Sequence, residues 1–228
     1  ADGCVITKSR AKPFARVRER MQEVIYAGMD ETGEVQVGPM AGGLVVFAAG
    51  NEGYYQGAAT KYPAADSRVV AVASIGADYR PAYYSSYGTW VDVSAPGGDP
   101  FFSDKENPYV GSGYGNTTAE VLSTIVNGYG LMSGTSMACP HVSGVAALIV
   151  SRHGGPGFTR EQLWDMLLDN ANPVIYENGR NEKFIDKLGK GLVDANASIA
   201  AGSKIAPDPV TDLALETKGR NLLLTWTV

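Results

Sequence analysis

The pattern of apolar and polar positions predicts helices and buried strands that alternate along the chain. Residues 43–49 (GLVVFAA) and 68–74 (RVVAVAS) are nearly continuous runs of small, apolar and β-branched side chains. Such runs are typical of parallel strands that are covered on both faces. Apolar residues at three- and four-residue spacing over residues 14–27 predict an amphipathic helix, and residues 136–152 predict a long apolar helix. Buried strands separated by helices indicate an α/β fold with a mostly parallel sheet and helices on both faces.

Weaker patterns predict the elements around these. Residues 159–169 predict a helix whose first residue, Thr159, has the side chain of a helix N-cap. Residues 189–201 (GKGLVDANASIAA) predict a strand-like turn and then a short helix. A short buried strand is predicted at residues 4–7, and residues 99–118, rich in Gly, Pro, Ser and Asn, are interpreted as a surface insertion.

Composition divides the chain into three parts. Residues 1–201 contain the predicted α/β domain, and residues 202–208 have the composition of a linker. Residues 209–228 alternate like strands but have no partner strands in the predicted sheet. The chain begins ADGCVI without an initiator Met and ends within the apolar run LLLTWTV. We therefore expect both ends to be truncated and the sheet to be incomplete at its N-terminus.

Charge and composition exclude several classes of protein. The chain has 228 residues, 44% of them hydrophobic, and a net charge of −5, which supports a buried core and argues against nucleic acid as a partner. Its two cysteines form neither a disulfide framework nor a metal-binding spacing. The longest apolar runs are too short for a transmembrane segment.

Two short stretches carry candidate chemistry. In residues 134–144 (GTSMACPHVSG), Ser136 lies at the predicted start of a helix, where unpaired N–H groups and the helix dipole favour negative charge. Asn51 follows a buried strand within Gly-Asn-Glu-Gly, and its amide can donate to an oxyanion. Taken singly, the first stretch is also an ordinary helix start and the second an ordinary loop. They are candidates for a serine nucleophile and an oxyanion donor, and the resemblance of both stretches to one family bears on the two together.

Five segments resemble one family and follow its order. GTSMACPHVSGVAALI is similar to the nucleophile motif of the subtilisin-like serine peptidases (subtilases), and VVFAAGNEG resembles the oxyanion-asparagine motif of that family. The segments YPAADSRVVAVASI, SSYGTWVDVSAPG and GKGLVDANASI resemble three further subtilase segments. The resemblance covers residues 1–201 and identifies them as the C-terminal portion of a subtilisin-like catalytic domain.

The resemblance implies roles for individual residues. Ser136 would be the nucleophile that forms an acyl-enzyme, and Asn51 would donate to the oxyanion together with the backbone N–H of Ser136. The substrate-binding residues implied in the same way are Ser9, Ala49, Gly50 and Thr135. Ala49 and Gly50 would form a wall of the S1 pocket, and a strand ending near Ser9 would pair with the substrate backbone. Here the sequence departs from the usual Ser-x-Gly of the family, since it reads Ser-Arg-Ala.

Neither histidine of the chain is predicted to serve as the catalytic base. His141 would lie about 140° around the helix from Ser136 and roughly 7.5 Å along it, and His153 lies farther along. In subtilisin the triad residues occur in the order Asp, His, Ser, so both missing members would precede Ala1. Residues 30–33 (DETG) are interpreted as a turn. We expect a serine endopeptidase fragment that is inactive alone; the alternative is a non-catalytic relative that binds peptides or a partner.

The remaining expectations concern ligands, location and the tail. No cofactor is predicted, although calcium could bind acidic and amide side chains of the insertion, namely Asp99, Asp104, Asn107 and Asn116. Cys139 is predicted to be a buried, protonated thiol. The resemblance implies a secreted or cell-envelope protein that acts on peptides or proteins, and the truncated sheet predicts dimerisation through exposed edges. Residues 209–228 resemble the start of a fibronectin type III module.

Overall fold

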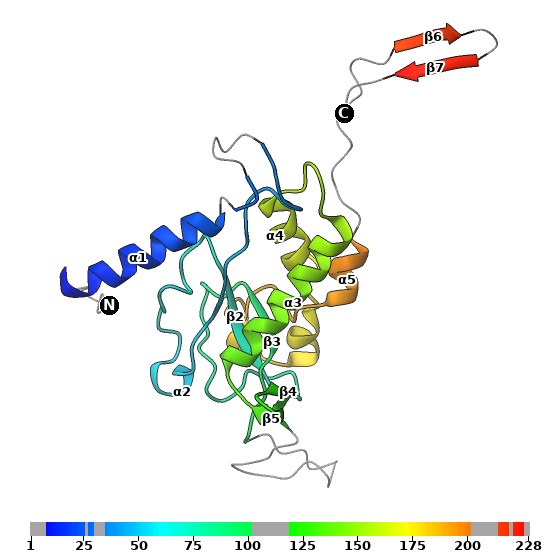
Figure 1. The fold of residues 1–228 in the computed structure, drawn as a ribbon. Helices are drawn as coiled ribbons and strands as arrows, with labels where there is room; N and C mark the ends of the chain where they lie inside the picture. The colour runs from blue at the N-terminus through cyan, green and yellow to red at the C-terminus, as the bar shows by residue number, and fades with distance from the viewer. Residues whose placement is uncertain are drawn as a thin grey trace.

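The computed structural model describes residues 8–25, 27–29, 35–101, 119–201, 214–218 and 221–225. The fold is built on a parallel sheet with strand order β1-β2-β3 (Figure 1). These strands are β1 (Val46–Ala48), β2 (Val70–Ile75) and β3 (Val93–Pro96). The predicted α/β class and the two predicted strands are therefore confirmed. The strand predicted at residues 4–7 and the turn predicted at 30–33 lie outside the described residues.

The central strand β2 is buried along its whole length, as its continuous apolar run predicts. Successive side chains of a strand point to opposite faces of the sheet. Val70 and Val72 therefore enter one hydrophobic cluster, while Ala73 and Ile75 enter a second cluster on the other face. The sheet is covered on both sides, which explains the absence of polar alternation in this segment.

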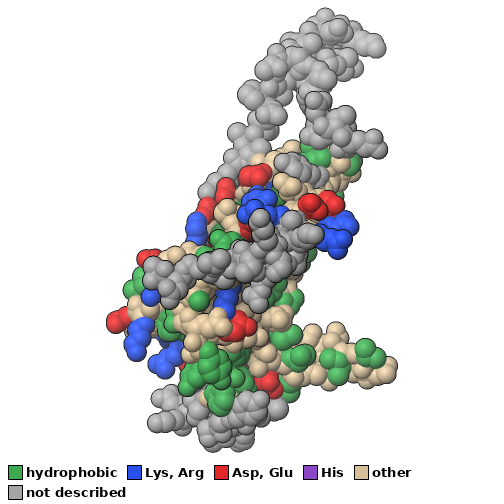
Figure 2. All heavy atoms as spheres, turned by 90° about the vertical axis from the view of Figure 1, so that its left-hand side faces the viewer, with side chains coloured by type: hydrophobic (Ala, Val, Ile, Leu, Met, Phe, Trp, Pro, Cys, Tyr) green, Lys and Arg blue, Asp and Glu red, His purple; other side chains and the backbone are tan. Residues whose placement is uncertain are grey.

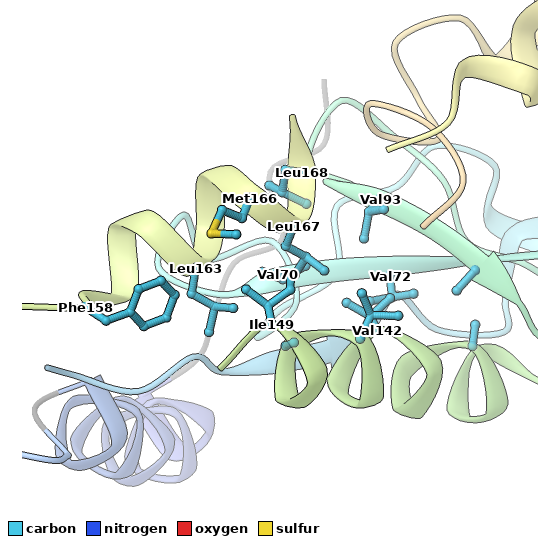
Figure 3. Close-up of a cluster of buried hydrophobic side chains, with 14 residues drawn as sticks. Val70, Val72, Val93, Val142, Ile149, Phe158, Leu163, Met166, Leu167 and Leu168 are labelled. Atoms are coloured by element: carbon cyan, nitrogen blue, oxygen red, sulfur yellow. The ribbon is translucent and has the colours of Figure 1, made fainter. Parts of the chain in front are cut away.

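Helix α3 (Thr135–His153) lies across one face of the sheet and contacts all three strands. Figure 3 shows Val142 and Ile149 of α3 beside Val70 and Val72 of β2. Helices α4 (Arg160–Leu168) and α5 (Ala195–Ala200) pack against α3 and extend the same core. The helices predicted over residues 136–152 and 159–169 are confirmed, and so is the short helix at the end of residues 189–201.

The opposite face is covered by helix α1 (Lys8–Ile25) beside β1 and by two 3₁₀ helices, Pro173–Gly179 and Glu182–Phe184. Met21 of α1 is buried, and Val17 and Val24 line an apolar groove together with Val45 and Phe47 of the β1 segment. The amphipathic helix predicted over residues 14–27 is thus confirmed. None of the helices in the described residues is both long and apolar enough to cross a bilayer.

Helix α1 begins earlier than the sequence pattern predicts. Ser9 is the second residue of α1, so the prediction of a strand that ends near Ser9 is wrong. The physical reason is composition, because residues 8–25 consist largely of Lys, Arg, Ala, Glu, Gln and Met, which favour the helical state. The side chain of Ser9 lies outside the described residues.

Two antiparallel hairpins complete the described structure. Strands β4 (Val121–Ile125) and β5 (Gly128–Met132) pair with each other and lead directly to α3. In Figure 2 an arm of hydrophobic and uncharged surface projects from the lower part of the molecule, where Figure 1 places these two strands. Strands β6 (Ala214–Lys218) and β7 (Asn221–Thr225) also pair with each other. The two tail strands are therefore partners of each other, and among the described strands neither joins the parallel sheet.

Candidate active site

Ser136 lies in the first turn of α3, at the carboxyl edge of the parallel sheet. Its side chain is exposed, and the N-cap residue Gly134 has a φ of 154°, a value that favours glycine. The N–H of Gly134 donates to the carbonyl oxygen of Gly97, directly after β3, over 2.9 Å. Asn51 stands three residues beyond the end of β1, on the short helix-forming loop before α2 (Gly53–Gln56). Strand ends of this kind are where open α/β sheets place their sites.

The backbone N–H groups at the start of α3 are almost all paired. Thr135 donates its N–H to the Oδ1 atom of Asn51 over 3.0 Å, and Met137 and Ala138 donate to the carbonyl oxygen of Gly134. Ser136 is the exception, because its N–H meets no acceptor among the described residues. A helix N-terminus thus presents one unpaired donor beside an exposed serine hydroxyl.

The side-chain amide of Asn51 is held in one orientation by Thr135. Its Oδ1 atom accepts the Thr135 N–H and also the Thr135 hydroxyl, over 3.0 and 2.8 Å. An amide nitrogen donates only, so these bonds assign the oxygen to the Thr135 side and leave the Nδ2 group directed away. Nδ2 has no acceptor among the described residues and lies 3.4 Å from the point where a Cβ on Gly134 would be. We call Asn51 Nδ2 and the Ser136 N–H the donor pair.

The loop that carries Asn51 is fastened to α3 at a second point. The N–H of Gly50 donates to the buried Thr135 hydroxyl over 3.2 Å. The preceding residue, Ala49, is buried and its side chain packs in the second hydrophobic cluster. Of the predicted site residues, the structure brings Gly50, Asn51, Thr135 and Ser136 together, with Ala49 next to them. It places Ser9 in α1.

Both histidines are engaged elsewhere on α3 and its neighbours. The His141 ring nitrogen Nδ1 is 2.8 Å from the carbonyl oxygen of Met137, one turn earlier. The His153 ring nitrogen Nε2 is 2.8 Å from the carbonyl oxygen of Ile199 in α5. Within the described residues no His, Asp, Glu or Lys side chain makes a hydrogen bond to Ser136.

The structure also describes Cys139 and one of the four candidate calcium ligands, Asp99. The Cys139 thiol donates to the carbonyl oxygen of Val46 over 3.6 Å, and burial raises its pKa, so the thiol is protonated as predicted, although Cys139 is half-buried rather than buried. The carboxylate of Asp99 accepts the N–H groups of Tyr83 and Phe101. The other candidate calcium ligands, Asp104, Asn107 and Asn116, lie outside the described residues. The described part of the chain holds no cluster of three acidic, His or Cys side chains suited to a metal ion.

Sequence reasoning missed the segment that supports both loops of the site. Ser86 donates its N–H to the carbonyl oxygen of Gly50, and Gly53 donates to the carbonyl oxygen of Tyr84, both over 2.9 Å. The Tyr84 hydroxyl reaches the carbonyl oxygens of Gly97 and Gly98. The Tyr-Ser-Ser sequence at residues 84–86 has no catalytic motif, so no signal in the sequence alone indicates this role.

The geometry and fold together define a class: an α/β protein that presents a serine hydroxyl and two N–H donors without an acceptor among the described residues, at the carboxyl edge of its sheet. The model of the subtilase family matches residues 13–198. Because this match covers most of the chain, the chain belongs to the subtilase family.

Individual relatives agree with this assignment. The extracellular basic protease of Dichelobacter nodosus is 35% identical over 170 residues, which are 70% of this chain and 23% of that protein. The thermostable alkaline protease of Halalkalibacterium halodurans is 38% identical over 143 residues, 61% of this chain and 33% of that protein. A solved protease structure from Pseudoalteromonas arctica is 35% identical, with a TM-score of 0.54, over 70% of this chain and 42% of that one. The chain thus matches only about a quarter to a third of the two sequence relatives.

Proposed function

We propose that this chain carries the nucleophile and the oxyanion hole of a serine endopeptidase. The Ser136 hydroxyl attacks the carbonyl carbon of a peptide bond, and a base takes the hydroxyl proton as the Oγ–C bond forms. The same proton passes to the leaving amine, the C–N bond breaks, and water then hydrolyses the acyl-enzyme. The observation that carries the proposal is the donor pair beside the Ser136 hydroxyl.

The donor pair stabilises the charge that develops on the substrate oxygen. Hydrogen bonds to an oxyanion strengthen as the transition state forms, so fixed donors lower the barrier without binding the ground state equally well. Thr135 contributes by orienting Asn51, and the backbones of Ala49 and Gly50 form the adjoining wall of the S1 pocket. Ser9 remains a proposed substrate-binding residue on the resemblance alone.

The base is proposed to come from outside these 228 residues. Both histidines bind backbone carbonyl oxygens, and a neutral serine hydroxyl without a base is a poor nucleophile. The chain alone should therefore hydrolyse peptides far too slowly for an ordinary assay. The same observation favours a second candidate function, a subtilase relative whose open cleft binds peptides or a protein partner without cleaving them.

Further proposals concern the setting of the protein. A secreted location is supported by the relative from Dichelobacter nodosus, which is called extracellular, whereas the cell-envelope alternative rests on the sequence resemblance alone. Dimerisation through a sheet edge remains a proposal from the sequence, and β1, which pairs only with β2 among the described strands, is the edge it would use. The reading of residues 209–228 as the start of a fibronectin type III module rests on the sequence resemblance, and the described strands of this segment form one hairpin.

A fluorophosphonate probe, which replaces its fluoride with the serine oxygen, tests the proposal. We expect very slow labelling of the chain alone and fast labelling after addition of the N-terminal half of a subtilase that carries the Asp and His motifs. Ser136→Ala should abolish labelling. Asn51→Leu should lower the rate of peptide hydrolysis by the complemented enzyme ~10²–10³-fold with an unchanged KM, the magnitude measured for the oxyanion donor of subtilisin, a member of this family.

The outcomes separate the candidates. Fast labelling of the chain alone would reveal a base within these residues. If complementation gives no labelling while peptides still bind, the peptide-binding function is supported instead.

A further inference from the structure

Tyr84 occupies a buried position behind the proposed site. The residue is 7% exposed, and its hydroxyl lies 2.9 Å from the Ser74 Oγ atom, 2.9 Å from the Gly97 carbonyl oxygen and 2.5 Å from the Gly98 carbonyl oxygen. Burial raises the pKa of Tyr84 to about 12, so the hydroxyl keeps its proton throughout the neutral range. A single proton therefore faces two carbonyl oxygens, and the Ser74 hydroxyl can donate to the Tyr84 oxygen in return.

The carbonyl oxygen of Gly97 connects this hydroxyl to the nucleophile helix. The same oxygen accepts the N–H of Gly134, the N-cap of α3. Gly97 has no free space, because a Cβ there would lie 2.0 Å from the Ser74 Oγ atom and 2.7 Å from the Gly134 carbonyl oxygen. A displacement of Gly97 must therefore displace Gly134, and with it the Ser136 N–H two residues later.

Backbone hydrogen bonds around Tyr84 also fix the loop that carries Asn51, whose Nδ2 group is the second member of the donor pair. The Tyr84 carbonyl oxygen accepts the N–H of Gly53, and Ser86 donates its N–H to the carbonyl oxygen of Gly50. These two bonds bracket Asn51 on both sides. Residues 84–86 thus fix the Asn51 loop through their backbone and the start of α3 through the Tyr84 hydroxyl.

We propose that Tyr84 is a positioning residue that sets the distance between Asn51 Nδ2 and the Ser136 N–H. This inference rests on the proposed function, since it concerns the oxyanion hole of that site. Tyr84 does not touch the substrate. It acts through Gly97 and Gly134, and its ring keeps its edge-to-face contact with Tyr83, 5.3 Å between centroids, when the hydroxyl is removed.

The test compares Tyr84→Phe with the matched control Tyr176→Phe in the full 228-residue chain. Tyr176 also donates its hydroxyl to a glycine carbonyl oxygen, that of Gly189 over 2.7 Å, and burial raises its pKa as well. Both variants lose the donated tyrosyl hydrogen bond, and Tyr84→Phe also removes the acceptor of the Ser74 hydroxyl, so local effects are compared after correction for global stability.

Amide hydrogen exchange gives the readout that does not depend on activity. With rates normalised to buried amides of β2, exchange at Gly134 should be roughly threefold to tenfold faster in Tyr84→Phe and unchanged in Tyr176→Phe, since one hydrogen bond of ordinary strength is lost at the Gly97 turn. Equal normalised rates in the two variants would overturn the proposal.

Fluorophosphonate kinetics on the complemented enzyme provide the functional arm. Tyr84→Phe should lower the labelling rate at saturating probe roughly tenfold while the half-saturating concentration stays the same, because a displaced donor weakens only transition-state binding. Equal labelling rates at saturating probe in the two variants would contradict a positioning role of Tyr84, even if hydrogen exchange at Gly134 differs between them. Failure of all labelling, by contrast, would contradict the proposed function and leave the exchange result to decide the role of Tyr84.

Discussion

At the scale of single residues, two aspartates show opposite effects of their surroundings. Burial raises the pKa of Asp92, whose carboxylate accepts the Ala71 N–H over 2.8 Å. The bidentate hydrogen bond from Arg68 lowers the pKa of Asp66. A raised carboxyl pKa means that the folded state binds the proton more tightly, so this group costs stability as pH rises above its ordinary pKa. A lowered pKa has the opposite sign, and its stabilisation is lost as pH falls.

We therefore predict opposite changes when these charges are removed. Asp92→Asn keeps an acceptor for Ala71 and removes the buried charge, so the free energy of unfolding at pH 7 should be equal to or higher than that of the wild type. The advantage should shrink as pH falls toward 4. Asp66→Asn should be less stable than the wild type at pH 7 and approach it at low pH. Urea titrations from about pH 2 to pH 8 measure both, because the stabilisation by Asp66 is lost only below the ordinary carboxyl pKa. Parallel pH profiles for the two variants would refute the assignment.

The sequence proposed residues that carry motifs and gave nothing on those that support them. Ser136 and Asn51 were proposed because their segments, together with three others, resemble one family in order; taken singly, each is an ordinary helix start or loop. Ser136 and Asn51 are 85 residues apart in the sequence, which says nothing of the distance between them in the fold. Only the structure shows the hydrogen bonds by which Thr135 orients the Asn51 amide. Tyr84 was missed because its role depends on a contact with Gly97 that no periodicity encodes.

At the scale of elements, helix α4 combines a strong sequence signal with a complete cap. The Thr159 Oγ1 atom accepts the N–H of Gln162, and the Gln162 side chain accepts the N–H of Thr159, which together form a capping box. This helix was predicted from Thr159 and its first turn, and its observed end agrees as well. Local chemistry determines such an element without help from the rest of the fold.

We predict that Thr159→Ala lowers the free energy of unfolding by ~1 kcal/mol, the usual cost of an N-cap threonine. Thr159→Ser should keep most of the wild-type stability, because the hydroxyl that accepts the Gln162 N–H is retained. Denaturant unfolding measures both variants. A loss within error of zero for the alanine variant would show that water replaces the cap, and altered labelling of Ser136 would show that α4 is coupled to the site.

The β4–β5 hairpin and the first residues of α1 were not predicted, for different reasons. The hairpin β4–β5 turns at Val126 and Asn127, directly before Gly128, the first residue of β5, and this Asn-Gly pair is a hairpin signal that was not used. Its loop places Asn127 at a φ of 65°, which asparagine tolerates better than most residues. Helix α1 was predicted too short because its first residues are charged and lack apolar periodicity.

At the scale of the whole molecule, the last segment of the domain closes the sheet beside β3. Ser94 donates its N–H to Gly191 and accepts that of Val193, over 2.9 and 2.8 Å. Just before this segment, Gly189 has a φ of 73°, and a Cβ there would lie 2.2 Å from the carbonyl carbon of Asp92. The chain can enter this position only through a glycine.

Gly189→Ala should therefore destabilise the entire domain, by at least ~2 kcal/mol, because backbone atoms on both sides must move. Gly157→Ala is a suitable control, since Gly157 has a similar φ of 82° but no atom near its Cβ position. Thermal unfolding should show a clearly larger loss for Gly189→Ala. Equal losses would mean that the left-handed backbone, rather than the close approach to Asp92, determines the cost.

The bond between Thr135 and the Asn51 amide also has a consequence for biosynthesis. At synthesis rates of roughly 5–20 residues per second, the ribosome adds Thr135 about 4 to 17 s after Asn51. Until then nothing fixes which way the Asn51 amide points, and Ser136 does not yet exist. A nascent chain that has only its first strands and helices therefore has neither a fixed Asn51 amide nor the Ser136 hydroxyl, and the proposed donor pair can form only after the start of α3 has been synthesised.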